Sequence, residues 1–484
     1  MQKTPSQLEK VLEPTLQIAL SYLENLDHAS VAPTVDLGTL RNRLGKRLDE
    51  QGLPPEQVVA ELATDVEGGL VGSVGGRFFG WVIGGSLPAA LAADWLAATW
   101  DQNAVLYATS PAAAIVEEVA GAWLKEILGL PGPASFAFVG GCQMAHLTCL
   151  AAARHALLAK RGWNVEQEGL SGTPRIRILA NDQCHGSIER AIRLLGLGKS
   201  NVIDIPTGGS ACIPPAALEK ALQNDPTSPT IVLLQAGEIN TGRFDNFDAL
   251  IPIAKSHGAW VHVDGAFGLW AAASPKYKHL VKGVEQADSW ATDGHKWLNV
   301  PFDCGYAFVA HPEAHQAAMS HRAPYLTFHA EARDQIDWNP QWSQRARGFP
   351  TYAALRQLGR KGISSLIENS CAHAHSIVMR IGQLPGAQIL CEPILNQGLV
   401  RFLDPRPGAT ESDHAKCTEE VMAAILATGE AFFTATDWNG HRAMRVSVCN
   451  WRTSDEDVER AVGAAASVLA GKTKLSDGET CFEI

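Results

Sequence analysis

Residues 260–266 read WVHVDGA, and residues 289–297 read SWATDGHKW. Each stretch begins as a short, largely apolar run, which is typical of a buried strand, and then meets charged residues and glycine. Asp264 ends the first run, and Lys296 closely follows the second. Because parallel strands of one sheet end at the same edge, where ligands bind, these stretches predict an acid and a lysine at one site.

Similar short runs recur on both sides of these stretches and alternate with helical patterns. The sequence predicts strands at 135–139, 175–180, 201–205, 230–235, 260–263, 289–292 and 305–309. Helices are predicted among them at 145–160, 187–195, 215–223 and 248–256. Apolar strands separated by helices indicate an α/β fold in which a mostly parallel sheet carries helices on both faces.

The composition fits a well-packed protein of two or three domains, because the 484 residues are 46% hydrophobic and 19% charged. The net charge of −11 disfavours nucleic acid and anionic membranes as partners. No apolar stretch approaches the roughly 18 residues of a spanning helix, and the first residues lack the pattern of a secretory signal. Ten cysteines occur singly, without C-x-x-C pairs, as expected for reduced thiols in a cytoplasmic protein.

Four strand ends carry residues suited to chemistry, and each has an ordinary alternative when it is considered alone. Asp264 is suited to cap a helix, and Lys296 to lie on the surface. A Gly-Gly turn at 140–141 serves many loops, and a single histidine such as His185 is more often structural than catalytic. If Lys296 is instead buried, we expect burial to lower its pKa and make the amine nucleophilic.

Together, the four strand ends match the needs of pyridoxal 5′-phosphate (PLP). This cofactor requires a lysine for its aldehyde, an acid for its pyridine nitrogen, a phosphate-binding loop and a flat group over its ring. The sequence offers Lys296, Asp264, the glycine loop before Cys142, and His185 for these tasks. PLP is therefore the predicted cofactor, and no metal is predicted at the site.

Several motifs resemble the group II PLP-dependent amino-acid decarboxylases, the family of aromatic-L-amino-acid, histidine and glutamate decarboxylases. The resemblance runs from about residue 78 to 451 and is carried by RFFG at 77–80, TSPA at 109–112, GGCQMA at 140–145, DQCHGSIER at 182–190, HVDGA at 262–266 and HKWL at 295–298. It implies PLP-dependent transferase fold type I and an obligate homodimer with active sites at the subunit interface.

The resemblance also implies roles for individual residues. Lys296 is similar to the family's Schiff-base lysine, and Asp264 to the partner of the pyridinium nitrogen. His185 is similar to the ring that stacks on PLP, and Ala266 to the residue on the opposite face. Contacts with the phosphate are implied at three further positions: Cys142, Gln143 and His295.

Three features depart from the family's pattern. Asp293 stands where many relatives carry asparagine near the phosphate, so we expect it to point elsewhere or to have a compensating donor. Gln143 replaces a hydroxyl residue. The stretch 327–344 lacks the loop tyrosine that protonates Cα in decarboxylating relatives. Either His329 or a residue elsewhere donates that proton, or the outcome changes, for example to an aldehyde.

The resulting hypothesis is decarboxylation of an L-amino acid to the amine and CO2, with Lys296, His185 and Asp264 as catalytic residues. One alternative is an aldehyde synthase, aminotransferase or other lyase on the same fold, and another is a non-catalytic PLP-fold protein. An aromatic substrate is predicted if Phe79, Trp81, Phe328 and Trp338 line a pocket, and the alternative is that these residues belong to the core or to a dimer interface. Three arginines are candidates to bind a side-chain carboxylate of the substrate, or to pair with surface acids, and the sequence does not distinguish among them: Arg347, Arg442 and Arg452.

Three parts are predicted along the chain. An N-terminal helical segment at 1–80 has helical patterns at 6–26, 37–51 and 55–66. A large PLP-binding domain follows at 81–355. A small α+β domain at 356–484 contains strands at 398–403 and 444–448 and a helix at 454–470.

Overall fold

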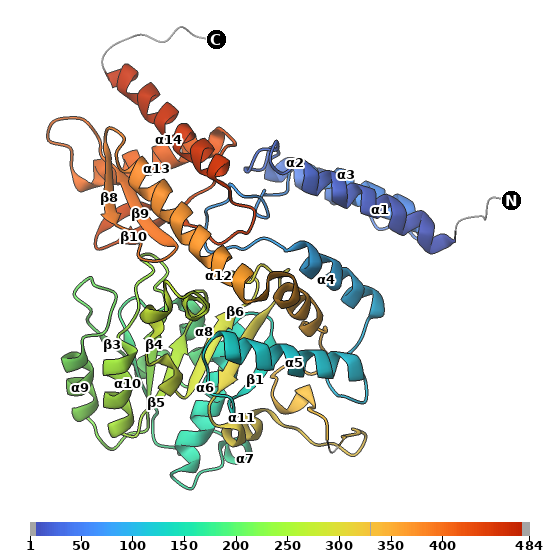
Figure 1. The fold of residues 1–484 in the computed structure, drawn as a ribbon, viewed down its shortest axis with the longest axis vertical. Helices are drawn as coiled ribbons and strands as arrows, with labels where there is room; N and C mark the ends of the chain where they lie inside the picture. Colours follow the sequence, from blue (N-terminus) through green and yellow to red (C-terminus); the bar gives the residue numbers. More distant parts are fainter. Residues whose placement is uncertain (1–5, 330, 477–484) are drawn as a thin grey trace.

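The computed structural model describes residues 6–329 and 331–476, which form an α/β body, a smaller sheet domain and a helical arm (Figure 1). The helices are α1 (Gln7–Glu24), α2 (Leu37–Leu44), α3 (Pro55–Asp65), α4 (Pro88–Trp100), α5 (Pro111–Ile127), α6 (Cys142–Ala159), α7 (Val165–Glu168), α8 (Gly186–Leu194), α9 (Pro215–Gln223), α10 (Phe247–Ser256), α11 (Pro312–Met319), α12 (Gly348–Ile381), α13 (Glu411–Ala427) and α14 (Asp455–Ser476). The strands are β1 (Ser135–Val139), β2 (Arg177–Asn181), β3 (Val202–Ile205), β4 (Thr230–Gln235), β5 (Trp260–Asp264), β6 (Ser289–Asp293), β7 (Gly305–Val309), β8 (Ala387–Cys391), β9 (Gln397–Phe402), β10 (Thr434–Trp438) and β11 (His441–Ser447).

The large sheet has the strand order β1-β7-β6-β5-β4-β2-β3. The five strands from β6 to β3 pair in parallel, whereas β7 runs antiparallel to both of its neighbours. Every residue of β1, β4, β5, β6 and β7 is buried, because one face packs against α5, α9 and α10 and the other against α6 and α8. The predicted fold class, a mostly parallel sheet covered on both faces, is confirmed.

The strand directions decide which loops meet. β5 and β6 are parallel neighbours in which Asp264 pairs with Ala291, so their carboxyl ends lie at the same edge of the sheet. Because β1 and β6 both run antiparallel to β7, β1 has the direction of β6 and ends at that edge too. The turn after Val139 and the start of α6 therefore lie beside the ends of β5 and β6.

The small sheet is antiparallel, in the order β10-β11-β9-β8, and α12, α13 and α14 contribute to the core beneath it. Phe79 is buried in this core, and Phe78 forms a β-bridge with Phe432. The segment before the predicted boundary at 80 thus packs with the small sheet. Helix α12 crosses the predicted boundary at 355 and leaves helical geometry at Gly359, where φ is 57°.

Helices α1 to α3 extend away from the body as an arm (Figure 1). None of the three contains a buried residue, although Leu8, Leu12 and Leu16 of α1 are apolar and 41–71% exposed. The helix predicted at 37–51 ends earlier, at Leu44, because Gly45 caps it and its N–H donates to the carbonyl of Arg41. Among the described helices, none is long and apolar enough to cross a membrane.

Candidate active site

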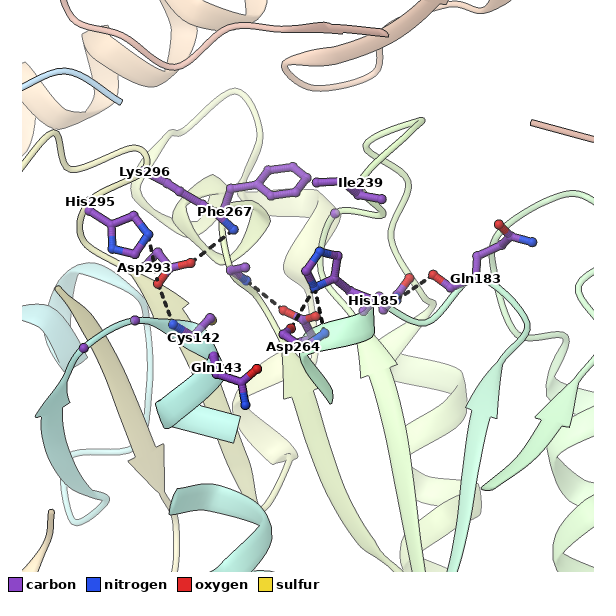
Figure 2. Close-up of a pocket in the computed structure, with 16 residues that line it drawn as sticks. Cys142, Gln143, Gln183, His185, Ile239, Asp264, Phe267, Asp293, His295 and Lys296 are labelled. Carbon is purple, nitrogen blue, oxygen red and sulfur yellow. Dashed lines mark hydrogen bonds and ion pairs between the residues drawn. The ribbon is translucent and has the colours of Figure 1, made fainter. Parts of the chain in front are cut away.

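A cavity of about 250 Å³ lies at the carboxyl edge of the large sheet (Figure 2). Its walls come from the ends of β5 and β6, the loop before α6 and the start of α8. All of the residues that the sequence predicts for the site line this cavity: Cys142, Gln143, His185, Asp264, Ala266, His295 and Lys296. The fold therefore gathers in one place residues that lie far apart in the chain.

Lys296 follows β6 and places its amine beside a carboxylate. Its Nζ lies 3.1 Å from Oδ2 of Asp293, a contact that Figure 2 marks with a dashed line. Burial by itself lowers the pKa of Lys296, but the negative charges around the amine, first that of Asp293 and also that of Asp264, together with the hydrogen bond to Asp293, outweigh burial, so the pKa rises above its usual value. The predicted lowering of this pKa is wrong, because an acid pairs directly with the buried amine.

Asp293 ends β6 and is bound from two sides. Its Oδ1 accepts a hydrogen bond from the backbone N–H of Cys142 at 2.6 Å, and the same oxygen lies 3.7 Å from Nε2 of His295. Cys142 is the first residue of α6, where helical N–H groups lack partners within the helix. The compensating donors expected for this acid are therefore present, and they are a helix start and the amine of Lys296.

Asp264 ends β5 in different surroundings. Only 7% of the residue is exposed, and its Oδ1 accepts a hydrogen bond from the N–H of Ala266 at 3.1 Å. The nearest ring nitrogen is Nε2 of the buried His146, which lies 3.7 Å from Oδ2. No lysine or arginine forms an ion pair with Asp264 among the described residues, so this carboxylate is available to a cationic ligand group.

His185 is the N-cap residue of α8, which fixes its place beside the cavity. Its Nδ1 accepts from the N–H of Ser187 at 3.3 Å and lies 2.7 Å from the Ser187 hydroxyl. Burial lowers the pKa of His185, partly opposed by the charge of Asp264, so the ring is neutral at pH 7. A neutral ring that is held by a helix start is suited to pack against a flat ligand.

The loop before α6 fits a phosphate group. Gly141 has φ of 128°, and a Cβ there would lie 3.0 Å from Cε1 of His295, so the turn requires glycine. Nε2 of Gln143 is buried and has no hydrogen-bond partner within the described part of the chain. An unpaired buried donor at a helix start, in the same cavity as Lys296, fits the phosphate of PLP better than it fits a closed core.

The three arginines singled out from the sequence do not line the cavity, within the residues described. Arg347 pairs with Asp303 at 3.2 Å, Arg442 pairs with Asp437 at 3.0 Å, and the guanidinium of Arg452 lies 4.9 Å from the Trp451 ring centre. Each of these three guanidinium groups is therefore engaged by residues outside the cavity.

Sequence reasoning missed Arg445, a buried cation on β11. It is 7% exposed, its Nε has no hydrogen-bond partner in the described chain, and its charge contributes to lowering the pKa of His185. The signal was present in the sequence, because an arginine interrupts the otherwise apolar run at 443–446.

The aromatic candidates for a substrate pocket lie elsewhere. Phe79 is fully buried in the small-domain core, and Trp81 packs against Phe432. Trp338 packs edge-on against His315, and the guanidinium of Arg322 lies over Phe328. The apolar walls of the cavity instead include residues that the sequence did not single out: Phe267 and Ile239.

Known proteins match the chain over most of its length. The family model described as the pyridoxal-dependent decarboxylase conserved domain matches residues 38–403. Tryptophan decarboxylase 1 of Oryza sativa subsp. japonica is 28% identical over 462 residues, covering 90% of this chain and 88% of that protein. Phenylacetaldehyde synthase of Petunia hybrida is 27% identical over 357 residues, covering 72% of this chain and 70% of that protein.

Among solved structures, the crystal structure of Oryza sativa TDC with PLP and tryptamine superposes with a TM-score of 0.90. It is 25% identical in sequence, and the match covers 98% of this chain and 99% of that one. The similarity therefore extends over the arm, the body and the small domain together.

Proposed function

The chain belongs to the pyridoxal-dependent decarboxylase family and is a PLP-dependent amino-acid decarboxylase, and we propose that its substrate is an aromatic L-amino acid. The family, the fold type and the cofactor expected from the sequence are thereby confirmed. Two observations support the aromatic substrate: the relatives include a tryptophan decarboxylase and a structure with bound tryptamine, and the cavity wall contains Phe267 and Ile239. An apolar wall favours an aromatic side chain because burial of apolar surface stabilises the complex.

The observation that carries the proposed site is the meeting of Lys296, Asp264 and His185 in one cavity. Lys296 would hold PLP covalently through Nζ, and the carboxylate of Asp264 would accept from the protonated pyridine nitrogen. The ring of His185 would lie on one face of the cofactor, and the methyl group of Ala266 would lie on the other. The phosphate would be held by groups at the start of α6 and by one histidine: Cys142, Gln143 and His295.

The protein's own groups set the conditions for the reaction. When bound, PLP supplies an electron-poor ring that stabilises the negative charge left at Cα as CO2 departs. Asp264 favours the protonated pyridine nitrogen because an ionised carboxylate in a buried site attracts positive charge more strongly than in water. Lys296, whose Nζ would carry PLP, would also be placed to hold or return a proton at that atom.

The test is a substrate panel with simultaneous detection of all products. Purified protein is loaded with PLP and given L-tryptophan, L-tyrosine, L-phenylalanine, L-histidine and L-glutamate under air, while CO2, amine, ammonia and hydrogen peroxide are measured. We expect one CO2 and one amine for each aromatic substrate consumed. Turnover of L-glutamate or L-histidine alone would contradict the aromatic substrate while leaving the decarboxylase in place.

A second candidate outcome is formation of an aldehyde. It is favoured by the stretch 327–344, which contains no tyrosine, and by the similarity to a phenylacetaldehyde synthase. His329 packs against Tyr107, with ring centres 5.0 Å apart, and is not among the cavity residues. Ammonia and hydrogen peroxide released together with CO2 in the same panel would identify this outcome.

The exposed arm supports a homodimer with active sites at the subunit interface. Three helices without buried residues expose a row of leucines, and Phe302, whose ring lies 4.6 Å from that of the cavity residue His295, is 61% exposed. A second copy would bury both surfaces, as in other obligate interfaces. Sedimentation of the purified protein is expected to give twice the chain mass, and a monomer at micromolar concentration would contradict the dimer.

A cytoplasmic location remains the proposed compartment. Cys184 and Cys212 are free thiols although they are only partly buried. Free thiols are typical of a reducing compartment. Fractionation of the cells that make the protein is the direct test.

A further inference from the structure

Behind Asp264, four buried side chains form a continuous series of polar contacts that leads away from the cavity. Nδ1 of His146 on α6 lies 2.9 Å from Nε2 of His262 on β5. Nδ1 of His262 lies 2.9 Å from the hydroxyl of Ser289, and the indole N–H of Trp260 donates to the same oxygen at 2.9 Å. None of the four is more than 4% exposed, so the series is sealed from solvent.

The spacing on β5 explains why this series reaches Asp264. Trp260, His262 and Asp264 alternate along the strand, so their side chains share one face of the sheet. That face packs against α6, which contributes His146, while Ser289 lies opposite His262 on the neighbouring strand. Two strands and one helix thus bring together five polar groups in an otherwise apolar core.

Two directions of proton donation along the series agree with what each group is able to donate. An indole N–H only donates, so the oxygen of Ser289 accepts from Trp260 and keeps one lone pair and one proton for Nδ1 of His262. When the hydroxyl donates, His262 carries its proton on Nε2 and donates to Nδ1 of His146. This leaves the proton of His146 on Nε2, the atom that lies 3.7 Å from Oδ2 of Asp264.

The opposite direction is disfavoured by its last contact. It would point the unprotonated Nε2 of His146 at the Asp264 carboxylate, so two electron-rich atoms would face each other in a buried site. Burial lowers the pKa of both His146 and His262 to about 3, so neither ring carries a charge at neutral pH. The pair therefore presents an N–H dipole to Asp264, without a positive charge.

We propose that His146 is a positioning residue for Asp264, held by His262, Ser289 and Trp260 in the tautomer whose Nε2–H faces the carboxylate. This inference rests on the proposed role of Asp264 as the partner of the pyridine nitrogen of PLP. A neutral donor stabilises the ionised carboxylate and its orientation, whereas a lysine or arginine at this position would compete with the cofactor for the same negative charge. Nε2 of His146 is buried and has no hydrogen-bond partner among the described residues, so no other acceptor there competes with Asp264 for this N–H.

The first test measures the dissociation constant of PLP through the visible absorption of the bound cofactor. His146→Phe keeps a buried ring but removes the N–H, and Ser289→Ala removes only the hydroxyl that sets the tautomer of His262. We expect His146→Phe to weaken PLP binding by roughly tenfold and Ser289→Ala by a smaller factor, in line with the loss of a donor to a charged group. Thr148→Val is the matched control, because Thr148 is a fully buried residue of α6 whose hydroxyl bonds only within its helix.

The double variant separates positioning from general packing. If Ser289 acts on Asp264 only through His146, then Ser289→Ala has no further effect on PLP affinity in the His146→Phe background. Additive effects of the two changes would overturn the proposal, and so would wild-type affinity in both single variants. Melting of the cofactor-free variants, compared with that of Thr148→Val, reports any loss of stability separately.

Nitrogen NMR of histidine-labelled, cofactor-free protein gives a readout that does not depend on PLP. The proposal expects His146 and His262 each to be protonated on Nε2 alone, and Ser289→Ala to alter the signal of His262. A bare Nε2 or a doubly protonated ring at His146 would overturn it. If wild-type protein binds no PLP at all, the proposed function fails instead, and the NMR result still decides the tautomer.

Discussion

Two aspartates end neighbouring strands of the large sheet, at the same edge and in the same cavity, yet they differ in what surrounds them. Asp293, at the end of β6, faces the amine of Lys296 at 3.1 Å and the first N–H of α6 at 2.6 Å. Asp264, at the end of β5, faces a backbone N–H at 3.1 Å and a neutral histidine at 3.7 Å. One acid is matched by the protein's own positive charge, and the other is not.

This difference separates two uses of the same residue type. The charge of Asp293 pairs with the amine of Lys296, and it raises the pKa of that amine against the effect of burial. The charge of Asp264 remains available to a ligand, because no lysine or arginine of the described chain forms an ion pair with it and its direct contacts are a backbone N–H and a neutral histidine. The first acid therefore adjusts the lysine, and the second is the one suited to hold a protonated ring nitrogen.

The largest effect is expected at Lys296, the group that both acids influence. Lys296→Ala removes the amine that would bind the PLP aldehyde, so turnover should fall by roughly a thousandfold or more. The visible absorption of covalently bound cofactor should disappear at the same time. Turnover near the wild-type rate would show that the cofactor is held by another group.

Asp264→Asn tests the unmatched acid. The amide keeps the size of the side chain but cannot attract a protonated pyridine nitrogen, so we expect kcat to fall by roughly a hundredfold and PLP to bind more weakly. Steady-state kinetics and cofactor titration measure the two effects. Asp293→Asn serves as the matched control, since it removes the same charge from the neighbouring strand.

Asp293→Asn itself should have a smaller effect, of the opposite sign for cofactor loading. Asp293 raises the pKa of Lys296, so its removal lowers that pKa and leaves more of the amine unprotonated at neutral pH. The rate at which PLP reacts with the amine should therefore rise severalfold, and its dependence on pH should move to lower pH. A slower reaction at every pH would mean that Asp293 mainly maintains the loop before α6.

The last effect concerns the stability of the fold rather than the rate of the reaction, and it arises at His146, behind Asp264. The pKa of His146 is 6.5 in an unfolded chain and about 3 when buried, so the unfolded state gains a proton first as the pH falls. Burial of the neutral His146 ring therefore costs no free energy of unfolding above pH 6.5. Below pH 6.5 the free energy of unfolding falls, by up to about 1.4 kcal/mol per pH unit. Urea unfolding at several pH values should therefore show a shallower acid loss in His146→Phe than in Thr148→Val. Equal slopes would contradict a buried, neutral His146.

Much of the body could be predicted from local sequence. The strands at 135–139, 230–235 and 305–309 have the bounds of β1, β4 and β7, because continuous apolar runs between turn residues are a strong signal. Helices α4, α5, α11 and α13 were not predicted, although α5 begins with the clear cap of Ser110 followed by Pro111. Their alanine-rich or mixed sequences show the 3.6-residue periodicity of a helix less clearly than the continuous apolar runs show the strands.

The site was predictable as a set of residues but less so as a set of contacts. Lys296, Asp264 and His185 each stand at a strand end or helix start, and that local position follows from sequence. Arg445 and His146 were missed because each lies within a strand or helix, where an isolated polar residue has many explanations. Their importance rests on partners that come from other elements.

The sequence alone determined the strand–helix alternation, the family motifs and the cofactor, since these depend on residues close together in the chain. Only the tertiary structure decided which acid meets Lys296 and which is left for a ligand. Both acids follow apolar strands and precede glycine, so their local patterns are alike. The antiparallel strand β7 places the start of α6 beside β6 and thereby beside Asp293, and electrostatic pairing depends on that distance in space.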